Sequence, residues 1–337
     1  MLPEALLTDV DRALERRQPL LASLAAADTD CCRLFHGIAE GEPGLTIDRY
    51  GPLLLLQTFR APLSHDDAEV LGTHVARRLG LDLAVAANHR GGGAHATAPQ
   101  PHAPSERALQ EHVCREAGVQ FLIRARHRGQ DPWLFLDLRE GRAALRALAH
   151  GRSVLNLFAY TCGAGIAALA GGSREVLNVD FAGSALAVGQ RNAELNGVHG
   201  ARFRTLASDC IPVLRQLAGQ PVQRRGRARP YPRIERRPFD VVLLDPPRFA
   251  KGPFGAVDVV RDYASLWKPC VLALADGGVA IATNHVPEVT AEDWCAALRR
   301  SADKAGRPLR DLELLPPAAD FPSFDGRPPL KVAVARV

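Results

Sequence analysis

The spacing of apolar and polar positions divides the chain into two parts. Residues 6–26 predict an amphipathic helix, because Leu6, Val10, Leu14 and Leu21 recur at helical spacing. Two strand-like runs, LTIDRY and LLLLQTF, then flank a Gly-Pro turn, and a helix over 64–79 and a strand LAVAAN follow. The segments VQFLIRARHR and PWLFLD, between 113 and 137, also favour strands. We expect a small α+β domain at 1–112.

Strands and helices alternate regularly from residue 153 onward. The predicted strands are VLNLF, EVLNVD, ARFRTLASD, FDVVLLD, GGVAIATN and KVAVARV, and the helices between them begin at GAGIAALAG, SALAVGQRNAELNG and CIPVLRQLAG. Strands separated by helices of this length predict βαβ units and a mostly parallel, Rossmann-like sheet. The second domain, 113–337, is therefore expected to be α/β, with its ligands at the carboxyl ends of the strands.

Composition fits a globular cytoplasmic protein. Of 337 residues, 47% are hydrophobic and 23% are charged. The seven cysteines contain no CxxC pair, which favours a reducing compartment over a disulfide framework or a zinc site, and no metal is expected. The N-terminus does not resemble a signal peptide, and no apolar run approaches the ~18 residues of a membrane span.

The charge allows a polyanionic partner without requiring one. The formal net charge is +5, with a pI of about 9.0. Residues 91–106, rich in Gly, Ala and Pro, are expected to be a surface loop. The insert at 221–238 is dense in arginine, and it is either a solvated loop or an arm for a phosphate backbone. In the second case the RNA contacts are Arg224, Arg225, Arg227, Arg229, Arg248 and Lys251.

A glycine-rich turn, NLFAYTCGAGIAALAGG, lies between the first α/β strand and its helix. Gly163 and Gly165 allow a tight turn and close approach of a ligand to the helix N-terminus. Asp180 ends the next strand, where a carboxylate can accept hydrogen bonds from ribose hydroxyls. These features indicate an adenosine-containing cofactor, and GAGIAA also matches the dinucleotide pattern GxGxxA. The alternative interpretation is structural, in which the glycines only allow the helix to pack closely on the strand.

Two acidic positions favour S-adenosylmethionine (SAM) over a nicotinamide cofactor. Asp209, after the third α/β strand, can accept from an adenine amino group. Asp245 and the carbonyls around Pro246 and Pro247, which are held rigid, can accept from an exocyclic amino group, and Phe249 can pack on a flat base. This Asp-Pro-Pro-aromatic pattern is typical of methyltransferases that act on planar nitrogenous substrates, mainly nucleobases.

The motifs together resemble a known family. FHGIAEGEPGLTIDRYG, WLFLDLREGR, VLNLFAYTCGAGIAALAGGSREVLNVD, FDVVLLDPPRFAKG and FPSFDGRPPLKVAVARV occur in the expected order over roughly 5–337. They are similar to the class I SAM-dependent ribosomal RNA methyltransferases that include the 23S rRNA cytosine-C5 methyltransferase I group. The resemblance implies a seven-stranded sheet whose last strand is antiparallel, preceded by a small α+β domain that grips RNA. It implies a cofactor site of Phe135, Asp137, Arg139, Phe158, Tyr160, Gly163, Asp180, Asp209 and Asp245.

The chain departs from this family at several positions. Family members often begin with a PUA RNA-binding domain, whereas this chain starts at the helix of the middle domain. Leu138 replaces a polar residue, and Cys162 replaces a glycine. Cytosine-C5 enzymes of the family carry a cysteine after the fifth strand, where this chain has Asn284 and His285.

The missing cysteine leaves the acceptor atom open. Methylation at cytosine C5 requires a thiolate that first adds to C6. Cys270 and Cys295 lie in helix-like segments and are more typical of buried small hydrophobes. Methylation of an amine needs only orientation and stabilisation of charge, with His285 either accepting a proton or capping the sheet.

Three functions are therefore considered. The first is a SAM-dependent methyltransferase of an RNA base, with 23S ribosomal RNA as the expected substrate. The second is a methyltransferase of a small molecule or protein side chain. The third is a non-catalytic RNA-binding or ribosome-assembly factor that keeps the SAM fold. The sequence leaves homodimer formation open.

Overall fold

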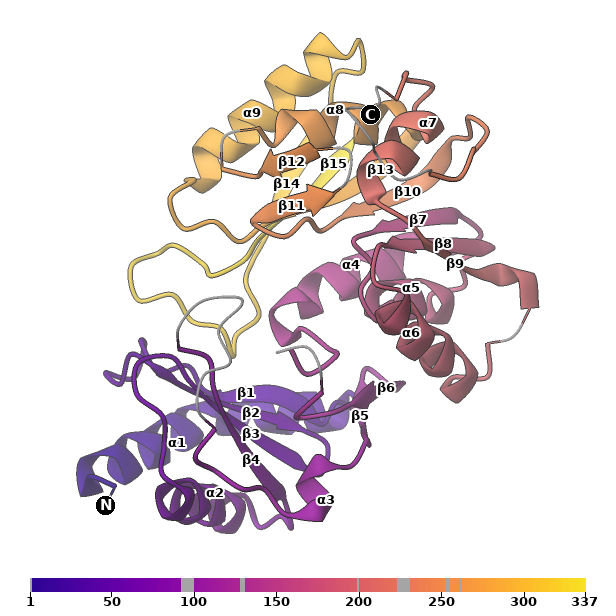
Figure 1. Ribbon diagram of the computed structural model, residues 1–337. Helices are drawn as coiled ribbons and strands as arrows, with labels where there is room; N and C mark the ends of the chain where they lie inside the picture. The colour runs from indigo at the N-terminus through magenta and orange to yellow at the C-terminus, as the bar shows by residue number, and fades with distance from the viewer. Residues whose placement is uncertain are drawn as a thin grey trace. The chain divides into compact units, whose positions relative to one another are not determined.

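The computed structural model describes residues 2–91, 100–127, 131–198, 200–222, 231–252, 255–260 and 262–337, without the side chains of 249–252 and 255–257. The chain forms two compact units (Figure 1). The first comprises Met1–Leu136 and Ala318–Gly326, and the second comprises Asp137–Pro317 and Arg327–Val337. No helix among these residues has the length and apolar character that a membrane span requires.

The first unit is a four-stranded sheet covered by two helices. Its strand order is β1-β2-β3-β4, with β3 and β4 parallel and the other neighbours antiparallel. Leu54 and Leu56 of β3 pack under the helices together with Val10 and Leu71, while Leu53 and Leu55 are buried on the opposite face. The elements are α1 (Glu4–Ala26), β1 (Cys31–Phe35), β2 (Leu45–Tyr50), β3 (Leu53–Thr58), α2 (His65–Leu79), β4 (Ala84–His89), α3 (Glu106–Leu109), β5 (His112–Glu116) and β6 (Val119–Ile123).

The boundary between the units differs from the expected one at residue 112. The hairpin β5–β6 belongs to the first unit. Two hydrogen bonds attach it there: Asp30 N–H donates to the Arg115 carbonyl (3.0 Å), and Arg115 N–H donates to Asp30 Oδ1 (2.6 Å). The prediction of a strand at PWLFLD is wrong. Trp133, Leu134 and Leu136 are buried without strand pairing, and the Leu134 carbonyl accepts from the Tyr50 hydroxyl at 3.2 Å.

A distant segment of the chain completes the first unit. The Arg33 backbone N–H donates to Asp320 Oδ2 at 2.8 Å, and Asp320 is fully buried. The Arg33 guanidinium lies 4.4 Å from the ring centroid of Phe321 and pairs with Asp48 at 2.7 Å. These contacts hold Ala318–Gly326 on the first unit, although the strands on either side of it belong to the second.

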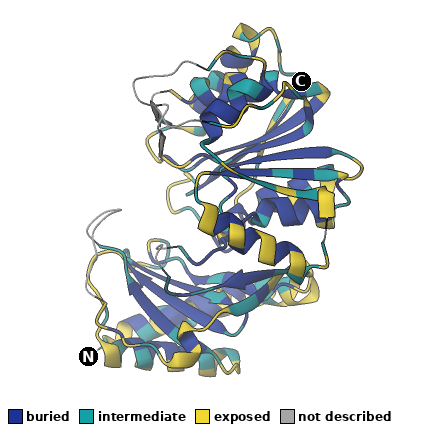
Figure 2. Cartoon of the chain, turned by 45° about the vertical axis from the view of Figure 1, so that its right-hand side comes forward, coloured by how far each residue is buried: buried dark blue, intermediate teal, exposed yellow. Residues whose placement is uncertain are grey.

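The second unit is a three-layer α/β/α structure around a seven-stranded sheet of order β14-β15-β13-β10-β7-β8-β9. Figure 2 shows its strands mostly buried. All neighbours pair in parallel except β15, which is antiparallel to both β13 and β14. The predicted seven-stranded sheet with an antiparallel last strand is confirmed. The strands are β7 (Ser153–Leu157), β8 (Glu175–Asp180), β9 (Phe203–Ala207), β10 (Phe239–Leu244), β13 (Leu274–Asn284), β14 (Asp311–Leu315) and β15 (Lys331–Arg336).

Helices cover both faces of this sheet. One face packs against α4 and α5 through Val154, Leu243 and Ile281, and the other against α7, α8 and α9 through Leu155, Leu244 and Ala282. The alternation follows from the two-residue period of a strand. The helices are η1 (Leu136–Leu138), α4 (Arg139–Leu148), α5 (Gly163–Ala170), α6 (Gly183–Leu195), η2 (Gly200–Arg202), α7 (Cys210–Leu217), α8 (Ala264–Leu272) and α9 (Ala291–Lys304). A two-stranded ribbon, β11 (Phe249–Gly252) and β12 (Gly255–Asp258), follows β10.

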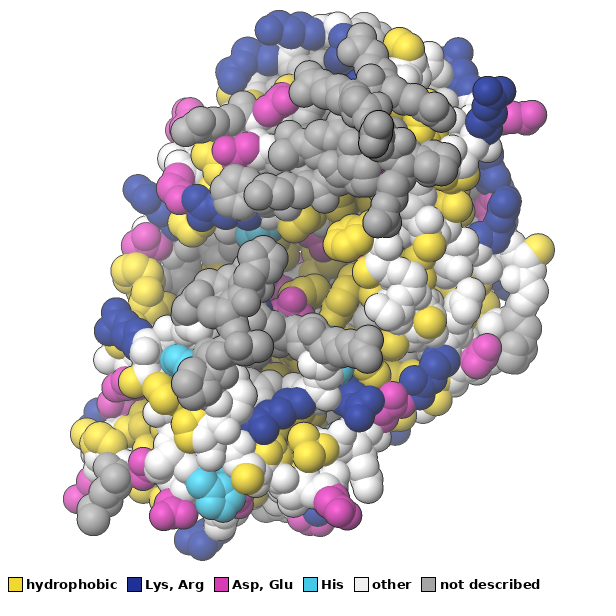
Figure 3. Space-filling view, viewed as in Figure 1, with side chains coloured by type: hydrophobic (Ala, Val, Ile, Leu, Met, Phe, Trp, Pro, Cys, Tyr) yellow, Lys and Arg dark blue, Asp and Glu magenta, His cyan; other side chains and the backbone are white. Residues whose placement is uncertain are grey.

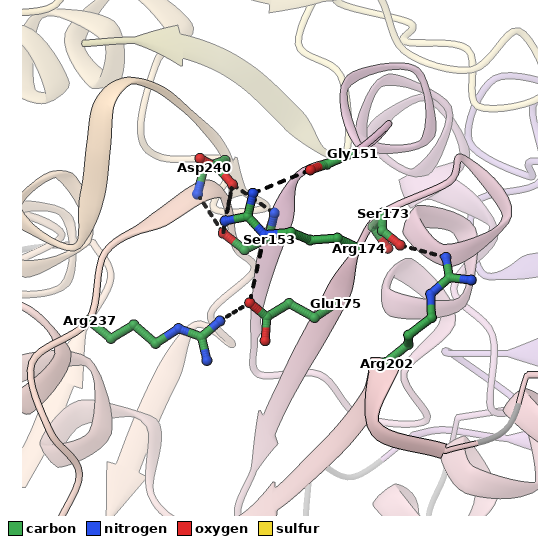
Figure 4. Close-up of polar contacts among 8 residues, drawn as sticks. All are labelled: Gly151, Ser153, Ser173, Arg174, Glu175, Arg202, Arg237 and Asp240. Carbon is green, nitrogen blue, oxygen red and sulfur yellow. Dashed lines mark hydrogen bonds and ion pairs between the residues drawn. The ribbon is translucent and has the colours of Figure 1, made fainter.

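Polar contacts tie together the amino ends of the central strands (Figure 4). Asp240 Oδ2 accepts from the Ser153 backbone N–H and hydroxyl, both at 2.8 Å, and pairs with Arg174 at 2.9 Å. Arg237 pairs with Glu175 beside them. Burial opposes ionisation of Asp240, but the Ser153 hydrogen bonds and the arginine charge outweigh it, so the pKa of Asp240 is lowered. This cluster fixes the sheet at the end opposite to the candidate site.

Candidate active site

The candidate site lies where the carboxyl ends of the parallel strands meet. The loop Phe158–Cys162 follows β7, Asp180 ends β8, Asp209 follows β9 and Asp245 follows β10. Parallel strands bring their carboxyl ends to one edge of the sheet. The three acidic residues that were predicted to follow strand ends do lie along that edge.

The loop after β7 has an unusual backbone. Phe158, Tyr160 and Cys162 have φ values of 57°, 48° and 61°, in the left-handed region that non-glycine residues rarely adopt. Hydrogen bonds to side chains hold the loop in this shape: Tyr160 N–H donates to Asp180 Oδ2 (2.8 Å) and Phe158 N–H donates to Cys210 Sγ (3.2 Å). Such strain persists only where the surroundings determine the conformation, and it is concentrated at functional sites.

Gly165, in the predicted turn, is required for packing of helix α5. A Cβ at Gly165 would lie 2.1 Å from Asn178 Oδ1, so this glycine lets α5 pack on β8. Close helix–strand packing therefore accounts for this glycine, and its place in the cofactor site stays a prediction. Gly163 is the first residue of α5, and the left-handed turn before it falls on Cys162.

Asp180 organises the same loop. One of its oxygens accepts from Tyr160 N–H and the other from Ala182 N–H, both at 2.8 Å. Burial raises the pKa of Asp180 and these backbone hydrogen bonds oppose that shift. Each carboxylate oxygen retains further lone-pair capacity, so Asp180 can also accept from two hydroxyls. The next residue, Phe181, is 73% exposed.

Asp209 contains a buried acceptor with no donor. Its Oδ1 caps α7 by accepting from Ile211 N–H at 2.9 Å, whereas its Oδ2 is buried without a hydrogen-bond partner among the described residues. Burial raises the pKa of Asp209. Leaving a buried oxygen unsatisfied is costly, so the atom suits a ligand that brings its own donor, such as an amino group.

Asp245 is the most perturbed acid of the site. Thr283, at the end of the neighbouring strand β13, donates a hydrogen bond to Asp245 Oδ1. Burial raises the pKa of Asp245 to about 6, and the Asp137 charge adds to this, while the Thr283 hydrogen bond and the Arg142 charge oppose it. A carboxylate with such a pKa can accept a proton near neutral pH.

His285 is held in its neutral form. Burial lowers its pKa, as do the charges of Lys331 and Arg248, while the Asp137 carboxylate opposes the shift. The Lys331 ammonium donates to the Val286 carbonyl at 2.9 Å, next to His285. A neutral imidazole at this edge is able to accept a proton.

The remaining predicted residues are distributed as follows. Asp137 and the buried Arg139 begin the second unit, whereas Phe135, 41% exposed, belongs to the first. Arg248 forms a surface ion pair with Glu288 at 2.6 Å. Phe249 and Lys251 lie on β11 with only their backbone described, and Arg224, Arg225, Arg227 and Arg229 lie outside the described residues.

Sequence reasoning did not assign roles to Thr283 and Arg142. The position of Thr283, at a strand's carboxyl end beside the strand of Asp245, is a signal that could have found it. Arg142 is 3% exposed on α4, and the helical pattern there predicts an exposed charged face, so the sequence carries no signal for it.

A separate group of potential metal ligands lies in the first unit. His65, Glu69 and His102 have ligand atoms within 4.8 Å of one another, the one such group within the described ranges. Ala87 N–H donates to His102 Nδ1 at 3.1 Å, so the ring proton is on Nε2, which lies 2.8 Å from Glu69 Oε1. Both nitrogens of His102 are thus used in hydrogen bonds, and the group is explained without a metal.

Comparisons with known proteins show the family of this chain. Residues 33–336 match the family described as S-adenosylmethionine-dependent methyltransferase, and the chain belongs to that family. It is 28% identical over 341 residues to the ribosomal RNA large subunit methyltransferase I of Erwinia tasmaniensis, covering 95% of this chain and 78% of the relative. It is 30% identical over 306 residues to the ribosomal RNA large subunit methyltransferase of Deinococcus radiodurans, covering 90% and 71%.

The fold is also shared with solved structures. A protein described as a SAM-dependent methyltransferase from Streptococcus mutans superposes with a TM-score of 0.74 at 21% identity, over 98% of this chain and 80% of that one. The protein is therefore a SAM-dependent methyltransferase, and SAM is its cofactor.

Proposed function

We propose that this protein transfers a methyl group from SAM to a base of RNA, with 23S ribosomal RNA as the substrate. The observation that carries the proposal is Asp245 at the carboxyl end of β10, with its raised pKa, hydrogen-bonded to Thr283 of the neighbouring strand and followed by two prolines. The names of the relatives, which are ribosomal RNA large subunit methyltransferases, support the choice of RNA.

The proposed cofactor site uses three acids along the strand ends. Asp180 receives the ribose hydroxyls, and the unpaired Oδ2 of Asp209 receives the adenine amino group. The strained loop of Phe158 and Tyr160 lines the same site, with Gly163 at the N-terminus of α5. Bound there, SAM would supply an electrophilic methyl group. Asp137, Arg139 and Phe135 are proposed to close over the cofactor.

The proposed substrate contacts are the rigid Asp245-Pro246-Pro247 segment and the aromatic ring of Phe249, with His285 available as a proton acceptor. The first unit and the arginine-rich insert are proposed to grip RNA. The formal net charge of +5 is consistent with RNA binding. On the face that Figure 3 shows, the described Lys and Arg side chains are interspersed with Asp and Glu. Because the seven cysteines include no CxxC pair, we place the enzyme in the reducing cytoplasm.

The test is direct. Purified protein is first assayed for SAM binding by calorimetry, and then for transfer of a labelled methyl group to ribosomal RNA from a strain that lacks the gene. We expect saturable SAM binding and label in the large-subunit RNA that ribonuclease removes. Failure to bind SAM, or to label RNA from the deletion strain, would contradict the proposal.

A second candidate is methylation of a small molecule or protein side chain. The described Lys and Arg side chains in Figure 3 are interspersed with Asp and Glu, which favours it, because a phosphate backbone is bound through positive charge. It predicts methyl transfer that survives ribonuclease and replacement of Arg224, Arg225, Arg227 and Arg229 by glutamine. A non-catalytic ribosome-assembly role predicts instead that Asp245→Ala leaves the cellular phenotype intact.

A further inference from the structure

Two buried side chains at the carboxyl edge of the sheet, Asn284 and Lys331, are held by the same residue. They are direct partners in the antiparallel pairing of β13 with β15, so both side chains leave the sheet on one face. Asn284 is 1% exposed and Lys331 is 6% exposed. Asn284 Oδ1 accepts from the Val286 N–H at 2.8 Å, and the Lys331 ammonium donates to the Val286 carbonyl at 2.9 Å. The two side chains therefore lie next to each other in a fixed arrangement.

The groups of this pair that lack a partner are hydrogen-bond donors. Nδ2 of Asn284 is buried without a hydrogen-bond partner among the described residues. The amide cannot be turned round to remove that donor, because its NH₂ would then face the Val286 N–H. The Lys331 ammonium carries three N–H groups, and the Val286 carbonyl takes one of them. A buried donor without a partner costs free energy, so the pair suits a ligand that supplies acceptors.

The charge of Lys331 also lacks a direct counter-ion. Within the part of the chain that the structure describes, no carboxylate forms an ion pair with its ammonium. Glu288 acts on Lys331 through its charge, but it pairs directly with Arg248 at 2.6 Å. Burial lowers the pKa of Lys331, because the surroundings disfavour the charged form. A buried cation without a counter-ion is unfavourable by itself, and it is typical of a site that receives an anion.

The strand order separates this pair from the proposed cofactor residues. Asp180 and Asp209 follow β8 and β9, on one side of β10. Asn284 and Lys331 belong to β13 and β15, on the other side of β10 and at the same edge of the sheet. Asp245, at the end of β10, lies between the two groups along that edge. An anion bound by the pair therefore belongs to the methyl acceptor rather than to the cofactor.

A phosphate diester matches this pair, because its oxygens are acceptors and it carries a negative charge. We propose that Asn284 and Lys331 bind a backbone phosphate of the RNA beside the target nucleotide. This inference rests on the proposed RNA-methylating function and adds a positioning contact to it. Phosphate contacts fix the register of a nucleic acid without reading its sequence. The pair thus holds the target nucleotide at Asp245 and leaves recognition of the base to other residues.

The first test replaces the unpaired donor by an anion of the same shape. In Asn284→Asp, one carboxylate oxygen can still accept from the Val286 N–H, and the other takes the place of Nδ2 beside Lys331. The variant thus supplies internally the anion that RNA supplies to the native protein. With ribosomal RNA from a strain lacking the gene, below the unfolding temperature of the variant, we expect the KM for RNA to rise about 10-fold or more. The affinity for SAM, measured by calorimetry, should stay native. A native KM, or a loss of SAM affinity, would overturn the inference.

The second test removes the positive charge. Lys331→Gln should reduce the slope of log(kcat/KM) for RNA against log salt concentration by about 1 in magnitude, because one phosphate contact is lost. Lys304→Gln, at the exposed last turn of α9, removes the same charge and should keep the native slope. Equal slopes in all three proteins, or equal changes in both variants, would overturn the inference.

The outcomes separate the phosphate site from the proposed function. If the native enzyme transfers no methyl group to RNA, the proposed function itself is contradicted. Methyl transfer by the native enzyme, with Asn284→Asp and Lys331→Gln both unaffected in KM and salt dependence, leaves that function intact and contradicts only the phosphate site.

Discussion

Thr283 donates a hydrogen bond to Oδ1 of Asp245 and so links the carboxyl ends of β13 and β10. The bond favours the ionised carboxylate, against burial and the Asp137 charge that raise the pKa of Asp245 to about 6. Because only the carboxylate can accept a proton, methyl transfer by the native enzyme should rise with pH through about 6. A rate profile that is flat between pH 5 and pH 7, both on the order of one unit from that pKa, would contradict this assignment.

Thr283→Val should shift that profile to higher pH. The substitution keeps the side-chain shape but removes the hydroxyl donor, and a hydrogen bond to a charged group contributes about 1.5–3 kcal/mol. The apparent pKa of the acidic limb should therefore rise by roughly one unit or more. Thr283→Ser, which retains the hydroxyl, is the matched control. The interpretation fails if both variants keep the native profile.

Asp245→Asn should stabilise the folded protein while reducing its activity. Raising the pKa of Asp245 from 3.8 to about 6 means that ionisation costs roughly 3 kcal/mol of folding free energy at neutral pH. Below the pKa of the unfolded chain this free-energy cost of ionising Asp245 is absent, and it accumulates as the pH rises from there through about 6. The Asn variant has no carboxylate and therefore never bears this cost. Chemical denaturation should thus show a gain of up to about 3 kcal/mol at pH 7 that disappears near pH 3.5. An equal gain at both pH values would refute the linkage.

Asp209→Asn should weaken SAM binding without unfolding α7. The Asn amide oxygen can still accept from Ile211 N–H. The amide NH₂, however, would take the place of the buried Oδ2, so that two donors would face each other at the adenine amino group. An unpaired buried donor costs about 1–3 kcal/mol, so the Kd for SAM should rise roughly 5- to 150-fold. Calorimetry measures the Kd, and thermal unfolding of the SAM-free protein serves as the control. Unchanged affinity would remove Asp209 from the cofactor site.

Cys162 and Gly189 should be energetically coupled. A Cβ at Gly189 would lie 2.4 Å from Cys162 Sγ, so Gly189→Ala alone should cost about 1–3 kcal/mol through overpacking. Cys162→Gly removes the sulfur and relieves the left-handed backbone at φ 61°. The double variant should recover at least about 0.5 kcal/mol relative to additivity in a denaturation cycle. Strict additivity would show that the two sites relax independently.

The sequence predicted the second unit well because its strands are continuous apolar runs separated by amphipathic helices. It missed β14, whose residues Asp311–Leu315 are mostly exposed and carry no strand pattern. It also could not show that Asp320 folds back onto Arg33, since that contact joins residues far apart in the chain. Segments that pair through long-range contacts leave little local signal.

The candidate site was predictable to a similar extent. Acids at strand ends follow from the strand pattern, and Asp180, Asp209 and Asp245 lie where that pattern put them. The packing of Gly165 on Asn178 was not predictable, because a glycine needed for packing and one needed for ligand approach look identical in sequence. The raised pKa of Asp245 depends on Thr283, Asp137 and Arg142, which only the folded structure brings together.

The most direct measurement of the central claim compares two variants of one strand. Asp245 and Asp240 lie at opposite ends of β10, and our proposal assigns a role in methyl transfer to Asp245 alone. With ribosomal RNA from a deletion strain and labelled SAM, Asp245→Ala should lose about 100-fold or more in methyl transfer. Asp240→Asn should lose stability, yet transfer at near the native rate at a temperature where it is folded. Native activity in Asp245→Ala, or equal losses in both variants, would contradict the account.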